Sequence, residues 1–145
     1  MKTPEANAPA PVELSIPSDA RWLTVVRLAV SGVAARCGAS YEDVDDIKVA
    51  VSEACTNAID HAFRDAECAG VISVSCYAGE GDIRIEVRDQ GCGFDPETAD
   101  TVDDANPDKQ GGLGLFLIRK LMDETQVVSS PGGGTTVVMV KRFER

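Results

Sequence analysis

The sequence predicts an α/β protein, a two-layer sandwich in which helices cover one face of a mixed, mostly antiparallel sheet. Short segments that alternate between apolar and polar residues, as strands do, occur near the start, in the middle and at the end of the chain. Segments with helical spacing follow the first strand and precede the last two. This grouping of strands and helices is typical of a sheet whose helices lie on one side.

A strand and a helix are expected at the beginning of the chain. Residues 12–16 alternate like a strand, and Pro17 and Ser18 then offer a break and a helix cap. Gly38 is well placed to end the helix that follows. The apolar face expected for this helix consists of Trp22, Val25, Val26, Ala29 and Val33. Arg27 lies off that face, so we expect it in solvent.

The second helix carries an unusual polar stripe. Ser40 and Asp43 have the spacing of a capping box, and the apolar positions that follow are Val44, Ile47, Val51, Ala54 and Ala58. Glu53, Asn57 and His61 stand four residues apart, so successive turns place them nearly above one another. A polar stripe on an otherwise apolar helix indicates a binding partner for these groups.

A hairpin is expected in the middle of the chain. Residues 71–77 and 83–89 both alternate, and the glycine-containing segment 79–82 separates them. The strand period of two places Asp89 on the same face as the apolar residues of its strand. A carboxylate is therefore predicted at the rim of the core.

The second half of the chain begins with a segment that lacks sustained periodicity. Residues 95–110 carry Pro, Asn, Thr and acidic side chains, which predicts a mobile loop and makes this segment a candidate lid. The glycine segment 111–114 then leads into a helix at 115–122. Two strands, 125–130 and 135–141, complete the expected sheet.

Composition restricts the class of protein. The chain has 145 residues, of which 43% are hydrophobic and 26% are charged, so we expect a flexible tail (1–11) followed by a single folded domain (12–145). A net charge of −10 argues against direct nucleic-acid binding. The five cysteines form no Cys-x-x-Cys pair, which indicates reduced thiols rather than disulfides or zinc. No apolar run approaches a membrane span, so a cytoplasmic location is expected.

Glu53 and Asn57 form the first candidate constellation. An Asn oxygen can complete the ligand shell of a Mg²⁺ ion that is otherwise held by phosphate oxygens and water. A carboxylate one turn earlier can accept a proton from an attacking hydroxyl group. The alternative is that both side chains merely face solvent, as Glu and Asn on helices often do.

Asp89, Gly91 and Gly93 form the second constellation. A strand-end carboxylate can accept a hydrogen bond from the amine of adenine, and alternate glycines allow a flat ring to approach the backbone. The alternative is an ordinary tight turn.

The third constellation is the glycine segment that opens the last helix. Backbone N–H groups and the helix N-terminus can bind phosphate without a basic side chain. The residues concerned are Gly111, Gly112, Leu113, Gly114 and Leu115. The segment lacks the Walker pattern, and a flexible loop entering a helix would look similar. After Gly134, Thr135 and Thr136 form a hydroxyl pair that either binds ligand or reflects strand propensity.

All four pieces occur in order, and together they resemble the nucleotide site of the GHKL ATPase superfamily, which includes histidine kinases and gyrase-type topoisomerases. The stretch VSEACTNAIDH (51–61) and the stretch GGLGLFLI (111–118), continued by LMDE (121–124), resemble one branch, the anti-sigma factor serine kinases of bacterial stress response and sporulation. The similarity runs from about Val12 to Lys141.

The resemblance implies the Bergerat ATP-binding fold and a set of residue roles. Asn57 would hold Mg²⁺, Asp89 would bind adenine, and Glu53 would be the base that deprotonates a serine of an anti-anti-sigma protein. Gly91 and Gly93 would lie beside the adenine ring, and the segment that opens the last helix would bind phosphate. His61 matches a histidine of the relatives, for which capping or packing is as good an explanation as catalysis.

The resemblance also implies partners. Arg27 falls where relatives carry a partner-binding arginine, and the family forms homodimers that bind either a sigma factor or the unphosphorylated anti-anti-sigma protein. The chain departs from some relatives in the expected lid, where Lys109 is the nearby basic residue, so a γ-phosphate contact from the lid is in doubt. Thr135 and Thr136 cannot be ranked from the sequence.

Two other functions stay open. A nucleotide-gated binding module without phosphotransfer would keep the pocket, although it would have less need of Glu53 as a base. An interaction domain that binds no nucleotide would not need the glycine segments. A histidine kinase is disfavoured because 145 residues leave no room for a phosphoacceptor domain.

Overall fold

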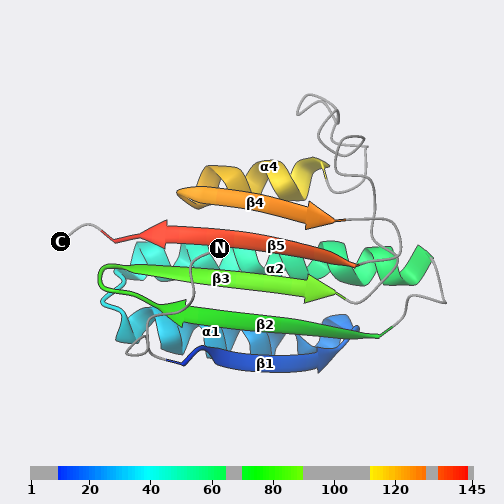
Figure 1. Cartoon of the computed structure of the whole chain (residues 1–145), viewed down its shortest axis with the longest axis horizontal. Helices are drawn as coiled ribbons and strands as arrows, with labels where there is room; N and C mark the ends of the chain where they lie inside the picture. Colours follow the sequence, from blue (N-terminus) through cyan, green and yellow to red (C-terminus); the bar gives the residue numbers. More distant parts are fainter. Residues whose placement is uncertain (1–9, 65–69, 90–111, 130–133, 144–145) are drawn as a thin grey trace.

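The computed structural model describes residues 10–64, 70–89, 112–129 and 134–143 (Figure 1). Its elements in chain order are β1 (Val12–Pro17), the 3-10 helix η1 (Ala20–Trp22), α1 (Leu23–Arg36), α2 (Tyr41–Arg64), β2 (Val71–Ala78), β3 (Asp82–Asp89), α4 (Gly112–Leu121), β4 (Glu124–Ser129) and β5 (Thr135–Arg142). Most of the expected tail and all of the expected lid lie outside the described residues. None of the described helices has the length and apolarity needed to span a membrane.

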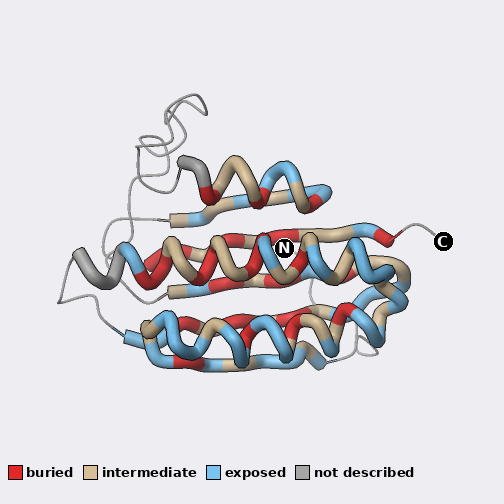
Figure 2. Tube along the Cα trace, turned by 180° about the vertical axis from the view of Figure 1, so that it is seen from behind, coloured by how far each residue is buried: buried red, intermediate tan, exposed pale blue. Residues whose placement is uncertain are grey.

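The structure is the expected two-layer sandwich. A five-stranded sheet with the order β1-β2-β3-β5-β4 forms one layer, and α1, α2 and α4 lie together on one of its faces (Figures 1 and 2). Every neighbouring pair of these strands is antiparallel, so the expectation of a mixed sheet is wrong for the described strands. For two of the four pairs, β2–β3 and β4–β5, the reason is that the strands follow each other closely in the chain, and short connections join antiparallel strands.

The core lies between the helices and the sheet. Ile83, Ile85 and Val87 of β3 are buried on the inner face, which confirms the strand period predicted for this segment. In α2, Ile47, Val51, Ala54 and Ala58 are buried as expected, and Val44 packs against the core. Figure 2 shows the buried positions of the helices on the side that meets the sheet.

The buried face predicted for α1 is partly wrong. Val26 is buried as expected, but its buried neighbours are Val30 and Ala34, while Trp22 and Val25 are 43% and 40% exposed. The helix is apolar around most of its circumference, so spacing alone could not select the buried face. Packing of α1 against α2 and the sheet determines which of its faces is buried.

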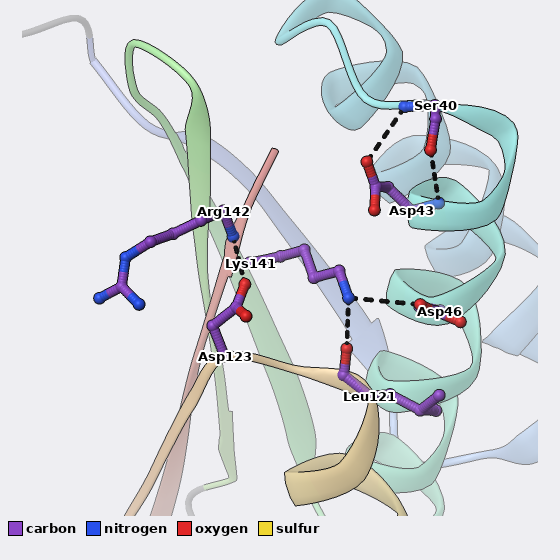
Figure 3. A network of polar contacts seen from close by, with 7 residues as sticks. All are labelled: Ser40, Asp43, Asp46, Leu121, Asp123, Lys141 and Arg142. Carbon is purple, nitrogen blue, oxygen red and sulfur yellow. Dashed lines mark hydrogen bonds and ion pairs between the residues drawn. The ribbon is translucent and has the colours of Figure 1, made fainter. Parts of the chain in front are cut away.

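The ends of α1 and α2 confirm two local predictions. Gly38 has φ 91°, a conformation that favours glycine, and it follows the last turn of α1. Ahead of α2, the amide of Asp43 donates to Ser40 Oγ at 3.1 Å, and the amide of Ser40 donates to Asp43 Oδ2 at 3.3 Å (Figure 3). The capping box therefore starts α2 and thereby sets the position of its polar stripe.

Candidate functional site

The predicted site residues that the structure describes gather at one end of the sandwich. The C-terminal end of β3, the beginning of β5, the beginning of α4 and the second half of α2 all lie at this end (Figure 1). The chain contributes them from segments far apart in the sequence. Of the first three candidate constellations, folding brings the described members Glu53, Asn57, Asp89 and Gly114 toward the same end of the protein.

Glu53 and Asn57 lie directly against the beginning of α4. A methyl group placed on Gly114 would stand 3.0 Å from Nδ2 and 3.1 Å from Oδ1 of Asn57, and 3.3 Å from Oε2 of Glu53. Gly114 is buried, and Glu53 and Asn57 are half-buried. A side chain at this position would force Asn57 and Glu53, or α4 itself, to move, so glycine suits the close approach of α4 to the polar stripe of α2.

The beginning of α4 suits an anion. Its first turn holds no acidic side chain, whereas Arg119 and Lys120 lie in its last turn. The first N–H groups of a helix have no partner within the helix, and they carry a partial positive charge. A phosphate at this end would find backbone donors beside the Asn57 amide and the Glu53 carboxylate.

The same residues fit a magnesium ion bound together with phosphate. Among the described residues, no group of three or more His, Cys, Asp or Glu side chains could hold a metal ion by itself. An ion at Asn57 would therefore need phosphate oxygens and water as its other ligands. Mg²⁺ commonly binds in this way, with few protein ligands.

The strand register separates the two threonines. Asp89 of β3 pairs with Thr135 of β5, whereas Arg88 pairs with Thr136. Thr135 is buried on the inner face with Val137 and is only 6% exposed, so it shares the face of Asp89. Its Oγ1 lies 2.8 Å from Ser129 Oγ in a hydrogen bond. Thr136 lies on the outer face, so Thr135 is the hydroxyl group placed beside Asp89.

Arg27 is exposed as predicted, but its guanidinium group has a partner on α2. Arg27 Nε donates to Ser52 Oγ at 2.7 Å, and Ser52 Oγ donates to the carbonyl oxygen of Lys48 at 2.7 Å. Ser52 directly precedes Glu53. Sequence analysis missed Ser52, although its position next to Glu53 in the polar part of α2 was a usable signal.

A buried thiol lies one turn beyond Ser52. Burial raises the pKa of Cys55 to about 12, and the nearby positive charge of Arg27 opposes this effect only in part. The thiol is therefore neutral at physiological pH and acts as a small apolar side chain in the core. This arrangement gives Cys55 a packing role behind the polar stripe.

Several predicted site residues cannot be placed. Gly91, Gly93, Gly111 and Lys109 lie outside the described residues. His61 lies on α2 and Leu113 on α4, but the structure does not describe their side chains. Leu115, in the next part of α4, is partly buried and packs against the core.

Comparison with known proteins identifies the class. Residues 16–141 match the family described as the histidine kinase-like ATPase domain. The fold agrees: a histidine kinase domain from Erythrobacter litoralis superposes with a TM-score of 0.55 at 23% identity, covering 95% of this chain and 66% of that one. The chain therefore belongs to the histidine kinase-like ATPase family.

Relatives narrow the family further. A protein of Staphylococcus aureus, the serine-protein kinase RsbW, is 40% identical over 141 residues, which cover 92% of this chain and 87% of the relative. The chain thus belongs to the RsbW family of serine-protein kinases. A Mycobacterium tuberculosis structure of RsbU and RsbW domains superposes with a TM-score of 0.68 at 26% identity, covering 94% of this chain and 33% of that longer one.

Proposed function

We propose that this kinase binds ATP and Mg²⁺ at the end of the sandwich where α4 begins, and that it phosphorylates a serine of an anti-anti-sigma protein. In its other state it sequesters an RNA polymerase sigma factor. The observation that carries this proposal is the contact of Gly114 with Asn57 and Glu53. It joins a helix N-terminus, an amide oxygen and a carboxylate, which are the groups that phosphoryl transfer requires.

Each described site residue has a proposed role in nucleotide binding. The first N–H groups of α4 bind phosphate, and Asn57 supplies an oxygen ligand to Mg²⁺. Asp89 accepts a hydrogen bond from the adenine amine, with Thr135 beside it on the paired strand. The metal ion supplies neutralisation of phosphate charge when it is bound. Gly91, Gly93 and the beginning of the 111–115 segment complete the proposed contacts.

Glu53 is the proposed catalytic base. Its carboxylate lies beside the proposed phosphate-binding end of α4, because its Oε2 would be 3.3 Å from a methyl group on Gly114. A serine hydroxyl held near this carboxylate can lose its proton as its oxygen attacks the γ-phosphoryl group. Positioning of the serine and of the phosphate contributes most of the remaining rate.

Arg27 is the proposed contact for both protein partners. Its link to Ser52 places the guanidinium group next to the turn of α2 that carries Glu53. A partner that binds Arg27 would therefore bring its own surface close to the proposed base. Competition between the sigma factor and the unphosphorylated anti-anti-sigma protein for this surface is the proposed switch.

We also propose that the protein is a cytoplasmic homodimer that acts in stress response. Three apolar side chains are exposed at and just ahead of the beginning of α1: Trp22, Val25 and Leu28 at 43%, 40% and 70%. A second copy of the chain would remove this apolar surface from water. The similarity to the serine-protein kinase RsbW and the resemblance of the site motifs support the regulatory context.

The test is transfer of label from γ-labelled ATP, with Mg²⁺, to a candidate anti-anti-sigma protein. We expect label on a serine of that protein, and we expect Glu53→Ala to lower the rate at least about a hundredfold while ATP still binds. A full rate in Glu53→Ala would remove Glu53 from the mechanism. Tight ATP binding with no transfer to a partner that demonstrably binds would instead indicate a nucleotide-gated binding module.

A further inference from the structure

A lysine at the far end of the α2–α4 contact joins three elements. The side chain of Lys141, on β5, is 14% exposed, and its Nζ donates to the carbonyl oxygen of Leu121 at 2.7 Å and to Asp46 Oδ2 at 3.3 Å (Figure 3). Leu121 ends α4, and Asp46 lies in the second turn of α2. One ammonium group therefore links the sheet to both helices.

The Lys141 contact suits the end of a helix. The last carbonyl groups of a helix have no partner within the helix, and this end carries a partial negative charge. An ammonium group can both donate a hydrogen bond to a free carbonyl group and offset the partial negative charge. The chain is also held just after α4, where the amide of Asp123 donates to the carbonyl oxygen of Val140 at 2.9 Å and the amide of Arg142 donates to Asp123 Oδ2 at 2.6 Å.

The two ends of α4 are matched to two positions on α2. The helices run in opposite directions (Figure 1), and Asp46 precedes Glu53 by seven residues, just as Gly114 precedes Leu121 by seven. Seven residues of helix span about 10 Å on either element. The contact at Lys141 and the contact at Gly114 therefore belong to the same axial register of α4 against α2.

We propose that Lys141 is a positioning residue, which sets the axial register of α4 and thereby holds the beginning of this helix against Asn57 and Glu53. The inference rests on the proposed function, because it assumes that phosphate binds at this beginning. Lys141 itself touches no substrate in this proposal. Its effect reaches the nucleotide through α4, so the effect is confined to the phosphate groups and does not extend to the adenine.

The experiment compares ATP with adenosine as ligands of the full-length chain. Lys141→Met keeps an unbranched side chain as far as the ε atom and removes the ammonium group. We expect the affinity for ATP to fall about tenfold, equivalent to ~1.4 kcal/mol, while the affinity for adenosine, which lacks phosphate, stays within about twofold. A general loss of structure would instead lower both affinities.

The matched control is Lys48→Met on α2. Lys48 also pairs with an aspartate, Asp45 at 3.5 Å, but this partner lies on α2 itself, so among the described residues the ion pair does not join α2 to α4. We expect this variant to bind ATP and adenosine like the wild type. Lys141→Arg keeps a cation that can reach the same acceptors, so it should restore most of the ATP affinity.

Three results would overturn the proposal: unchanged ATP affinity in Lys141→Met, an equal loss for ATP and adenosine, or no recovery in Lys141→Arg. If Lys141→Met does not fold, Asp46→Asn tests the same register, because it weakens one of the two contacts and should lower ATP affinity alone. If the wild-type protein binds ATP no more tightly than adenosine, the proposed phosphate site is refuted instead. The two failures are thus distinguishable.

Discussion

The two flanks of α2 carry different contacts within a single helical turn. On the flank that faces α4, Glu53 and Asn57 meet a glycine, and no side chain intervenes. On the flank that faces α1, Ser52 meets the guanidinium group of Arg27. Adjacent residues of a helix point about 100° apart, so Ser52 and Glu53 are neighbours in sequence that serve different partners.

The difference between the two flanks allows α2 to contact the nucleotide on one side and the protein partner on the other. The α4 flank is built around backbone donors and close approach, which suits phosphate. The α1 flank presents an exposed cation that is held by a hydroxyl group, which suits a protein surface. Under the proposed roles, substitutions on one flank should leave binding of the other flank's ligand almost unaffected.

The largest effect on ATP affinity is expected for Asn57→Ala on the α4 flank. Removing the proposed oxygen ligand should lower ATP affinity in the presence of Mg²⁺ by roughly 10- to 100-fold, the range seen when metal sites lose supporting groups. With Mg²⁺ removed by chelation, the variant and the wild type should bind ATP alike. Titration with and without EDTA measures both values, and an equal difference under both conditions would contradict the metal role.

Gly114→Ala should have the next largest effect. The added methyl group would lie within 3.0 to 3.3 Å of Asn57 and Glu53, so these side chains or α4 itself must shift. Strain of this kind costs roughly 1–3 kcal/mol, and we expect about a tenfold loss of ATP affinity. Equilibrium binding of ATP tests this; an unchanged affinity would show that the close approach is not needed.

Ser52→Ala on the α1 flank should have a smaller and different effect. Arg27 would lose the acceptor of its Nε, so its guanidinium group would be less well ordered for a partner. We expect the affinity for the anti-anti-sigma protein to fall about fivefold, equivalent to roughly 1 kcal/mol, the typical net contribution of one intramolecular hydrogen bond. ATP affinity serves as the internal control, and a loss there would mean that the flanks are coupled.

The smallest effect is expected at Gly32, a helical glycine of α1 with no neighbouring atom within 4 Å of an added methyl group. Gly32→Ala makes the same chemical change as Gly114→Ala, but in open space. Because alanine favours helix over glycine, the free energy of unfolding should rise by roughly 0.5–1 kcal/mol. Chemical denaturation measures this value, and a decrease would show that the outer flank of α1 is more crowded than the structure indicates.

Much of the fold could be predicted because its signals are local. The capping box at Ser40 and Asp43 depends on residues three apart, and the inner face of β3 follows from a period of two. The prediction of the buried face of α1 was partly wrong for the same reason. Residue spacing depends only on local geometry, and α1 has apolar residues on several sides. Where a helix has one apolar stripe, as α2 does, the prediction of its buried face was correct.

In the candidate site, too, the sequence predicted the local features but not the contacts between distant segments. Sequence alone placed Glu53 and Asn57 on one stripe of a helix and Asp89 at the end of a strand, because periodicity determines which way a side chain points relative to its own element. It could not decide between Thr135 and Thr136, find Ser52 beside Arg27, or connect Lys141 with Asp46. Those facts depend on strand register and on contacts between residues 25 to 95 positions apart. Only the packing of the tertiary structure determines such distances, because no local repeat of the chain encodes them.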